Sequence, residues 1–150
     1  MSLPNRKHPV HPPPVVRMEF PVVIFLTACS RDHHVMFTDE TVHKAMRCAW
    51  READFWKTGY YLIMPDHVHW FSTPRVFPTY SLKRWVRYWK RLVSQRLHCD
   101  PDSLWQVDAW DTQMRSYDHY VAKLAYVRLN PVRKGLVART EDWPYQGYVE

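Results

Sequence analysis

The sequence lacks the cysteine pattern of a disulfide-bonded protein and the long apolar run of a membrane-spanning one. Its three cysteines, Cys29, Cys48 and Cys99, are odd in number and widely spaced. This usage excludes a disulfide framework and a paired-cysteine zinc site, and it indicates reduced thiols in a cytoplasmic setting. No apolar run is long enough to cross a bilayer, and the N-terminus lacks the apolar core of a signal peptide. We therefore expect a cytoplasmic protein with no membrane partner.

The composition is that of a folded, basic protein. A length of 150 residues allows one domain with a substantial core. Hydrophobic residues make up 46% of the chain, with eight tryptophans and nine tyrosines, which excludes a disordered protein. The formal charge of +6 favours an anionic partner such as nucleic acid, with simple solubility as the alternative. We divide the chain into a Pro-rich basic tail at 1–21 and a single domain at 22–150.

Hydrophobic periodicity predicts alternating strands and helices in the domain. The expected strands lie at 22–27, on either side of the Pro65-Asp66 turn within 60–74, and within 104–115. The expected helices lie at 39–57 with Thr38 as N-cap, at 80–97, and from Ser116 or Tyr117 to about Asn130. This order predicts the α+β class. We expect a ferredoxin-like antiparallel sheet with helices on one face and an additional C-terminal tyrosine-bearing helix.

The stretch at 60–74 organises the chain, because its second run carries His67 and His69. Side chains alternate across a strand, so these two rings should converge on one face of the sheet. Two imidazoles at that spacing can bind one divalent metal ion, while Val68 between them should face the core. The alternative is an ordinary polar pair with no ligand.

The helix expected at 80–97 has one face whose charged residues are all positive. An apolar stripe should be buried, and the other positions carry several cations and no acid. A solvated helix face normally mixes signs, so we interpret these cations as phosphate contacts, with a solvated face as the alternative. The predicted nucleic-acid-binding residues of this helix are Lys83, Arg84, Arg87, Lys90 and Arg91.

The last expected helix carries a second polar face. His119, Lys123, Tyr126 and Asn130 fall at i, i+4, i+7 and i+11, so they share one side of the helix. If this helix covers the free face of the sheet, it could bring Tyr126 to the histidine pair. The amide oxygen of Asn130 could then be a third metal ligand, because Mg²⁺ and Mn²⁺ favour oxygen. A helix C-cap is the alternative role.

Three segments together resemble one family. Met64–Trp70 (MPDHVHW) resembles the histidine–hydrophobic–histidine signature of HUH single-strand DNA endonucleases. Tyr126–Val137 (YVRLNPVRKGLV) is similar to the tyrosine helix and its exit in single-tyrosine HUH transposases. With Trp105-Gln106 and Trp110-Asp111, these segments most resemble the REP-associated tyrosine transposases, over about residues 22 to 147.

The resemblance implies a metal-dependent endonuclease and strand transferase that acts on single-stranded or hairpin DNA, with repetitive palindromic elements as expected targets. It implies that Tyr126 forms a covalent 5′-phosphotyrosine intermediate and frees a 3′-hydroxyl. His67, His69 and Asn130 would hold Mg²⁺ or Mn²⁺, and Lys123 would join the DNA-contacting residues. Thr112 departs from the pattern, because relatives often have a histidine there.

Two other functions stay open from the sequence. One is a non-catalytic domain that binds single-stranded nucleic acid through the same basic helix and aromatic residues. The other is a small metallohydrolase in which Tyr126 is only structural. A covalent protein–DNA adduct would separate the transposase-like function from both. The sequence also leaves open whether the protein forms a homodimer.

Overall fold

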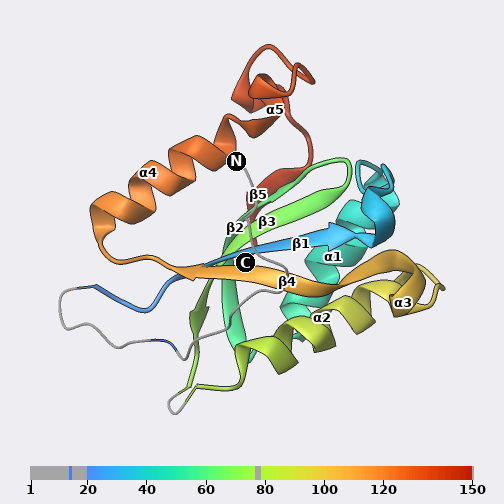
Figure 1. Cartoon of the computed structure of the whole chain (residues 1–150), viewed down its shortest axis with the longest axis horizontal. Helices are drawn as coiled ribbons and strands as arrows, with labels where there is room; N and C mark the ends of the chain where they lie inside the picture. Colours follow the sequence, from blue (N-terminus) through green and yellow to red (C-terminus); the bar gives the residue numbers. More distant parts are fainter. Residues whose placement is uncertain (1–13, 15–19, 77–78, 150) are drawn as a thin grey trace.

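One antiparallel sheet of five strands forms the centre of the protein (Figure 1). A computed structural model describes residues 14, 20–76 and 79–149, so most of the predicted tail at 1–21 lies outside the described residues. The strand order is β4-β1-β3-β2-β5. The strands are β1 (Ile24–Ser30), β2 (Trp56–Ile63), β3 (His67–Pro74), β4 (Trp105–Gln113) and β5 (Gln146–Tyr148).

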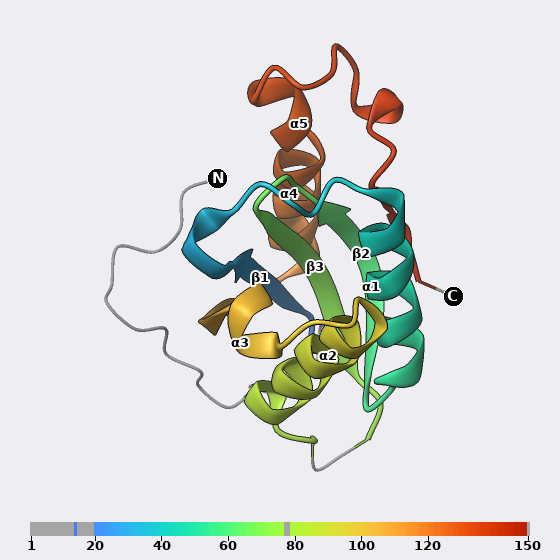
Figure 2. The ribbon, with the colours of Figure 1, turned by 90° about the vertical axis from the view of Figure 1, so that its right-hand side faces the viewer.

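Helices lie on both sides of this sheet. Figures 1 and 2 show α1 (Glu40–Glu52) and α2 (Leu82–Arg96) next to each other on one face, with α4 (Tyr117–Arg128) and α5 (Asn130–Arg133) on the other. The short elements are α3 (Pro101–Leu104) and 3-10 turns at Arg31–His33 and Thr140–Asp142. The predicted ferredoxin-like α+β fold with an additional tyrosine-bearing helix is confirmed. No described helix is both long enough and apolar enough to span a membrane.

Tryptophans fill the layer between the sheet and the α1–α2 pair. Trp89 of α2 is fully buried, and its ring lies 4.9 Å from that of Trp50, 4.8 Å from Trp70 and 5.1 Å from Trp105, between centroids. Aromatic pairs at such distances add attraction beyond the area that they bury. This cluster joins both helices to β3 and to the start of β4, which fixes the sheet against the helical layer.

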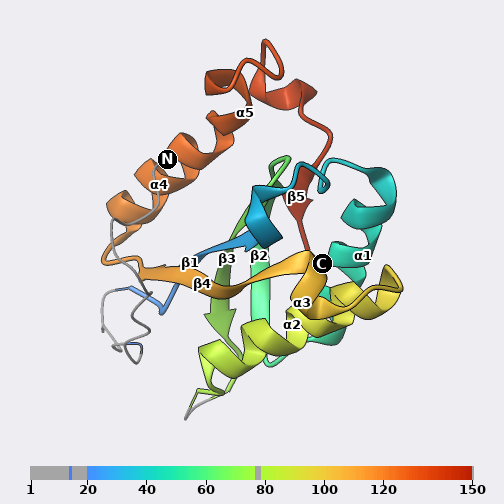
Figure 3. The same cartoon turned by 45° about the vertical axis from the view of Figure 1, so that its right-hand side comes forward.

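A second, smaller core lies on the opposite face of the sheet. It includes Val23, which directly precedes β1, together with Phe25 of β1 and Phe71 of β3, and α4 contributes Tyr120, Leu124 and Val127. Val121 of the same helix is 43% exposed. Figure 3 shows α4 rising from the end of β4 along this side of the sheet. Only part of the face is covered in this way, and the histidine pair lies on the same face.

The boundary between α1 and β2 differs from the predicted one. We expected a helix at 39–57 capped by Thr38, but Asp39 is the N-cap and accepts the N–H groups of Thr41 and Val42. The helix ends at Glu52. Trp56, which continued the helical stripe in sequence, starts β2 and donates its ring N–H to the carbonyl of Tyr80. An apolar residue at this position can be buried either in a strand or in a further helical turn, so the apolar spacing could not show where the helix ends.

Other boundaries shift by a few residues. The first strand runs from Ile24 to Ser30 rather than over 22–27, and α2 begins after Ser81, whose hydroxyl accepts the N–H of Arg84. The third helix begins at Tyr117, within the predicted range, and Ser116 is its N-cap. The edge strand β5 was not predicted, because its three residues pair with β2 only through long-range contacts.

Lys90 of α2 is a buried structural residue, which corrects its predicted place on the exposed basic face. It is 7% exposed, and its ammonium group donates to the carbonyls of Gln106 at 2.8 Å and Asp108 at 3.3 Å. These carbonyls lie where β4 bulges away from β1, since Ala28 is opposite Ala109 but Ser30 is opposite Trp105. A bulge leaves backbone groups unpaired, and Lys90 satisfies them. Burial lowers the pKa of Lys90 to about 8, so the cost of desolvating the ammonium group offsets part of the stability that these hydrogen bonds contribute.

Removing Lys90 should therefore destabilise the fold. Lys90→Ala deletes a buried stem, at about 0.8 kcal/mol for each CH₂ group, and leaves the bulge carbonyls unpaired. We expect the free energy of unfolding in urea to fall by about 2–4 kcal/mol. Lys83→Ala, on the exposed side of the same helix, is the matched control and should cost less than about 0.5 kcal/mol. Equal small losses at both positions would contradict the structural role.

Candidate active site

His67 and His69 converge at the start of β3, as their spacing predicted. Their ring centroids are 4.7 Å apart, on the sheet face opposite the tryptophan cluster. Val68 and Trp70 point to the other side and are fully buried in the main core. The alternation of one strand therefore places two imidazoles together on the less covered face.

The orientation of His69 is fixed by its neighbours. Its side chain is 1% exposed, and its Nδ1 atom lies 2.8 Å from the hydroxyl oxygen of Thr27 on β1. The ring of Phe25 stacks on the imidazole at 5.2 Å between centroids. Nε2 is buried and has no hydrogen-bond partner among the described residues. A buried nitrogen without a partner is costly, so Nε2 of His69 is suited to bind a ligand.

A carboxylate from the β2–β3 turn holds His67. Oδ1 of Asp66 lies 2.7 Å from Nδ1 of His67, and Oδ2 of the same carboxylate lies 3.5 Å from Nδ1 of His33. Asp66 therefore connects the strand histidine to the loop after β1. A carboxylate on Nδ1 directs Nε2 of a histidine toward its ligand, as in many metal sites.

Both imidazoles favour the neutral form. Burial lowers the pKa of His69 well below its ordinary value, and the neighbouring His67, Lys123 and Arg133 lower it further. Burial also lowers the pKa of His67, although its hydrogen bond with Asp66 acts in the opposite direction. A neutral imidazole has a lone pair on one nitrogen, so both Nε2 atoms can act as ligands near neutral pH.

An open cavity of about 480 Å³ lies in front of this pair. We call it the histidine cavity, and its lining residues are Cys29, His33, Val35, Met64, Pro65, Asp66, His67, His69, Lys134 and Leu136. Its carboxylate is already engaged with two histidines, whereas Lys134 brings a positive charge. The cavity is thus able to accept an anionic group next to two neutral imidazoles.

The tyrosine helix contributes charge to the site through Lys123. Its ammonium group lies 5.2 Å from the centre of the Phe25 ring, which in turn stacks on His69. The charges of Lys123 and Arg133 both act on the pKa of His69. Lys123, Arg133 and Lys134 therefore form a group of cations around the histidine pair.

Tyr126 lies beside this group but does not line the histidine cavity. Its side chain is 44% exposed on α4. The guanidinium carbon of Arg133 lies 3.8 Å from the centre of the Tyr126 ring, and the same guanidinium donates to the Tyr126 carbonyl at 2.7 Å. The expectation that the helix would bring this tyrosine to the histidines is thus met only indirectly, through Arg133.

Asn130 is buried at the start of α5. It is 2% exposed, and its amide oxygen has no hydrogen-bond partner among the described residues. The alternative role as C-cap of α4 falls to Leu129 instead. Within the ranges 14, 20–76 and 79–149, no three histidine, cysteine, aspartate or glutamate side chains form a metal-binding group. A metal ion at His67 and His69 would therefore need additional ligands, and Asn130 does not line the histidine cavity.

The exposed cations of α2 lie on the other side of the sheet. Lys83, Arg84, Arg87 and Arg91 are exposed on the outer surface of this helix, whose inner surface packs on the tryptophan core. The structure therefore does not bring them to the histidine pair. Thr112, where the family pattern has a histidine, is an exposed residue of β4 opposite Phe25.

Two residues of the site were missed in the sequence. Thr27 is a polar residue inside an apolar strand, which is a weak signal for a buried hydrogen bond. Arg133 follows Tyr126 by seven residues, but only the turn between α4 and α5 folds it back onto the ring. Both depend on contacts that a linear pattern does not show.

Comparisons with known proteins give a consistent result. No protein-family model matches the chain. A REP-associated tyrosine transposase of Escherichia coli (strain K12) is 27% identical over 90 residues, which cover 59% of this chain and 52% of the relative. The chain is thus similar in sequence to a REP-associated tyrosine transposase over somewhat more than half of its length. A Haemophilus influenzae protein named "Putative REP-associated tyrosine transposase" is 25% identical over 99 residues, covering 57% of this chain and 55% of that protein.

The fold agrees with that of a solved relative. A structure of a REP-associated tyrosine transposase bound to a REP hairpin superposes with a TM-score of 0.70 at 20% identity. The superposition covers 88% of this chain and 80% of the other. The chain spans about half the length of the curated REP-associated tyrosine transposases that it matches. The sequence resemblance to the family is thus confirmed.

The Thr27–His69 contact can be tested by a substitution that keeps shape. Thr27→Val leaves Nδ1 of His69 without a partner in a buried position, so we expect the free energy of unfolding to fall by about 1–3 kcal/mol. Thr27→Ser, which keeps the hydroxyl, should restore most of this loss in thermal or urea unfolding. The matched control is Thr58→Val, because the Thr58 hydroxyl is similarly buried but has no hydrogen-bond partner in the described part of the chain. A loss at Thr58 as large as that at Thr27 would contradict the importance of this hydrogen bond.

Proposed function

We propose that the protein is a transposase-like enzyme that cleaves and rejoins single-stranded or hairpin DNA, with Tyr126 as the nucleophile. The observation that carries this proposal is the pair of histidines, whose lowered pKa values favour the neutral form, in an open cavity that Lys134 lines. The charges of Lys123 and Arg133 also act on His69. Phosphodiester cleavage needs charge neutralisation at the phosphate, and this arrangement supplies it. The family relationship supports the same chemistry.

The reaction would balance without an external energy source. Oη of Tyr126 attacks phosphorus, and the bond between phosphorus and the 3′-oxygen breaks. The phenol loses a proton and the departing 3′-oxygen gains one, which gives a 5′-phosphotyrosine link and a free 3′-hydroxyl. Because the link keeps the phosphodiester energy, a 3′-hydroxyl can reverse the step without ATP.

The cations around the cavity would hold the phosphate in place. Lys134 lines the cavity, and Lys123 lies over Phe25 next to His69. Arg133 would have two functions, because its guanidinium contacts the Tyr126 ring and its charge reaches His69. Arg133 would thus position the nucleophile relative to the phosphate.

The residues present fit a divalent metal ion. His67 and His69 would bind it through their Nε2 atoms, and Asn130 through its buried, unpaired amide oxygen. When bound, Mg²⁺ or Mn²⁺ would neutralise charge on the phosphate oxygens. Thr27 and Asp66 would keep the two imidazoles in the orientation and the tautomer that binding requires.

A non-catalytic nucleic-acid-binding domain is the second candidate, because Tyr126 does not line the histidine cavity. In that function the cations would still bind phosphate, but no covalent link would form. The hairpin in the structure of the solved relative is the reason why we choose hairpin DNA, with repetitive palindromic elements as the first sequences to test.

Tyr126→Phe is the decisive variant. It should abolish the covalent adduct with a labelled hairpin oligonucleotide that has single-stranded flanks, while leaving the fold and the DNA affinity unchanged within about twofold, because only the hydroxyl is removed. Denaturing gels detect the adduct, and mass spectrometry locates it. Tyr117→Phe, an exposed tyrosine of the same helix, is the control and should behave as wild type. An adduct on Tyr117 or Tyr120 would overturn the assignment.

A mixing experiment shows whether one chain holds the whole site. Tyr126→Phe and His67→Gln proteins are each expected to be inactive. If their mixture recovers adduct formation, the site is completed by a second copy of the chain, and the protein acts as a homodimer. If the mixture stays inactive, one chain supplies both Tyr126 and His67.

Metal binding can be measured without DNA. Calorimetry with Mn²⁺ should show binding to the wild-type protein, a loss of at least about tenfold in affinity for His67→Gln, and a smaller loss for Asn130→Ala. His34→Gln, an exposed histidine of the neighbouring loop, is the control and should bind as wild type. Unchanged affinity in Asn130→Ala would remove Asn130 from the ligand set. Unchanged affinity in His67→Gln would refute the metal site.

A further inference from the structure

A second hollow lies on the outer surface of α2, on the opposite side of the sheet from the histidine cavity. Its volume is about 310 Å³. Its lining alternates aromatic rings and guanidinium groups, and we call it the aromatic–arginine hollow. The lining residues are Phe55, Tyr80, Arg84, Arg87, Tyr88 and Arg91.

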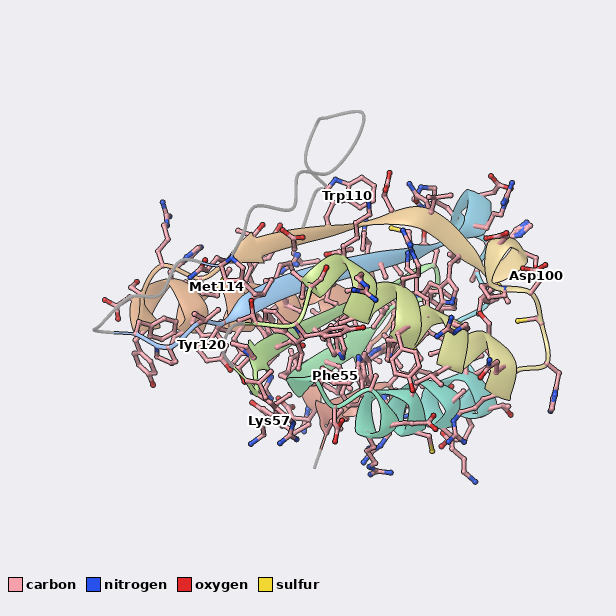
Figure 4. All side chains as sticks on the ribbon, turned by 90° about the horizontal axis from the view of Figure 1, so that it is seen from below. Phe55, Lys57, Asp100, Trp110, Met114 and Tyr120 are labelled. Carbon is pink, nitrogen blue, oxygen red and sulfur yellow. The ribbon has the colours of Figure 1, made fainter. Side chains whose placement is uncertain are left out.

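The aromatic rings of this hollow include one exposed ring and two half-buried ones. Phe55 and Tyr80 stack at 4.5 Å between centroids with an interplanar angle of 16°. Phe55 is 45% exposed, although all eight tryptophans are buried. Figure 4 shows Phe55 beside α2, near the connection between α1 and β2. The exposed ring of Phe55, already stacked on Tyr80, offers a planar apolar surface at little ordering cost.

The arginines line the same side of the helix. Arg84, Arg87 and Arg91 are spaced by three and four residues, so they follow one face of α2. The guanidinium of Arg84 lies 5.6 Å from the Tyr80 ring centre, and that of Arg91 lies 5.3 Å from the Tyr88 ring centre. Within the described part of the chain none of the three forms an ion pair. Among the described residues their guanidinium groups are therefore not engaged by a carboxylate, and the arginines are suited to contact an anionic ligand.

We propose that the aromatic–arginine hollow binds unpaired nucleotides of the DNA substrate, with bases stacked on its rings and phosphates on its arginines. The inference rests on the proposed function, since it takes single-stranded DNA as the ligand. Base stacking on aromatic side chains and electrostatic contact with the backbone are the two features of sequence-tolerant single-strand binding. The hollow combines both within one helix face and its neighbouring loops.

A single strand fits this hollow better than a duplex or an acidic peptide. Bases inside a duplex are stacked on each other and do not offer their faces to protein rings. An acidic peptide would satisfy the arginines but has no planar groups for Phe55 and Tyr80. Only an unpaired, anionic chain of planar groups uses the whole lining.

The position of the hollow gives it a role that is separate from chemistry. The sheet and the tryptophan core lie between it and the histidine pair. A strand held there would be the flank of the substrate, away from the cleaved phosphate. Binding at the hollow would thus add affinity for substrates with long single-stranded flanks.

Binding measurements with two probes test the proposal. The probes are a fluorescent oligo-dT of about 12 nucleotides and an abasic oligonucleotide of the same length and charge. Phe55→Leu and Tyr88→Leu should each weaken oligo-dT binding about five- to tenfold and leave abasic binding unchanged, because only the ring face is removed. Arg87→Gln and Arg91→Gln should weaken both probes and each reduce the salt slope by about 0.7.

Matched controls lie outside the hollow. Tyr148→Leu removes an exposed ring on β5, and Arg96→Gln removes an exposed arginine near the end of α2. We expect smaller effects from both than from the hollow variants. Equal effects of hollow and control variants, or equal loss of oligo-dT and abasic binding in the leucine variants, would overturn the proposal.

Cross-linking supplies a second measurement that needs no substitution. An oligonucleotide with 5-iodouracil, irradiated in complex with the wild-type protein, should label Phe55, Tyr80 or Tyr88. Labelling elsewhere with none at these rings would overturn the proposal. These measurements require no cleavage. A wild-type protein that forms no adduct would therefore refute the proposed function alone, whereas unchanged affinity in the hollow variants would refute only the hollow.

Discussion

The alternation of side chains along β3 is the constraint on which both the fold and the site depend. Val68 and Trp70 enter the tryptophan core, and His67 and His69 face the opposite side. A shift of one residue in the register would bury the imidazoles in the main core and expose the indole. Because β3 pairs with both β1 and β2, its register is fixed from two sides. The stability of the core therefore also determines the geometry of the histidine pair.

The surroundings of the histidines are built from other elements. β1 brings Phe25 and Thr27, the β2–β3 turn brings Asp66, and the segment after α5 brings Lys134. Burial favours the neutral form of both imidazoles. The ammonium group of Lys123 lies against the ring of Phe25, which stacks on His69 and separates the charge from the imidazole. This separation allows two uncharged ligands and several cations to exist side by side. The anionic substrate that we propose would need such an arrangement.

Features with a local cause were predictable from the sequence, and features with a long-range cause were not. The histidine pair follows from the period of a strand, and the N-cap of α4 follows from Ser116. The predicted end of α1 was wrong, because Trp56 belongs to β2 and is buried there, and not in a further turn of the helix. Lys90 looked like its exposed neighbours because its partners are carbonyls of a bulge in β4. The place of Tyr126 depends on how α4 docks, which no spacing along the chain determines.

The bulge of β4 also affects how the molecule behaves in a crowded solution. β4 is an edge strand, and a regular edge with unpaired backbone groups can add a strand of another molecule. Here the ladder is interrupted, and the carbonyls of Gln106 and Asp108 are already bonded to Lys90. Although Val107 is 86% exposed at this edge, the backbone around it lacks the regular pattern that a second strand would need. A residue that stabilises one irregular strand would thereby also disfavour the addition of a further strand at this edge.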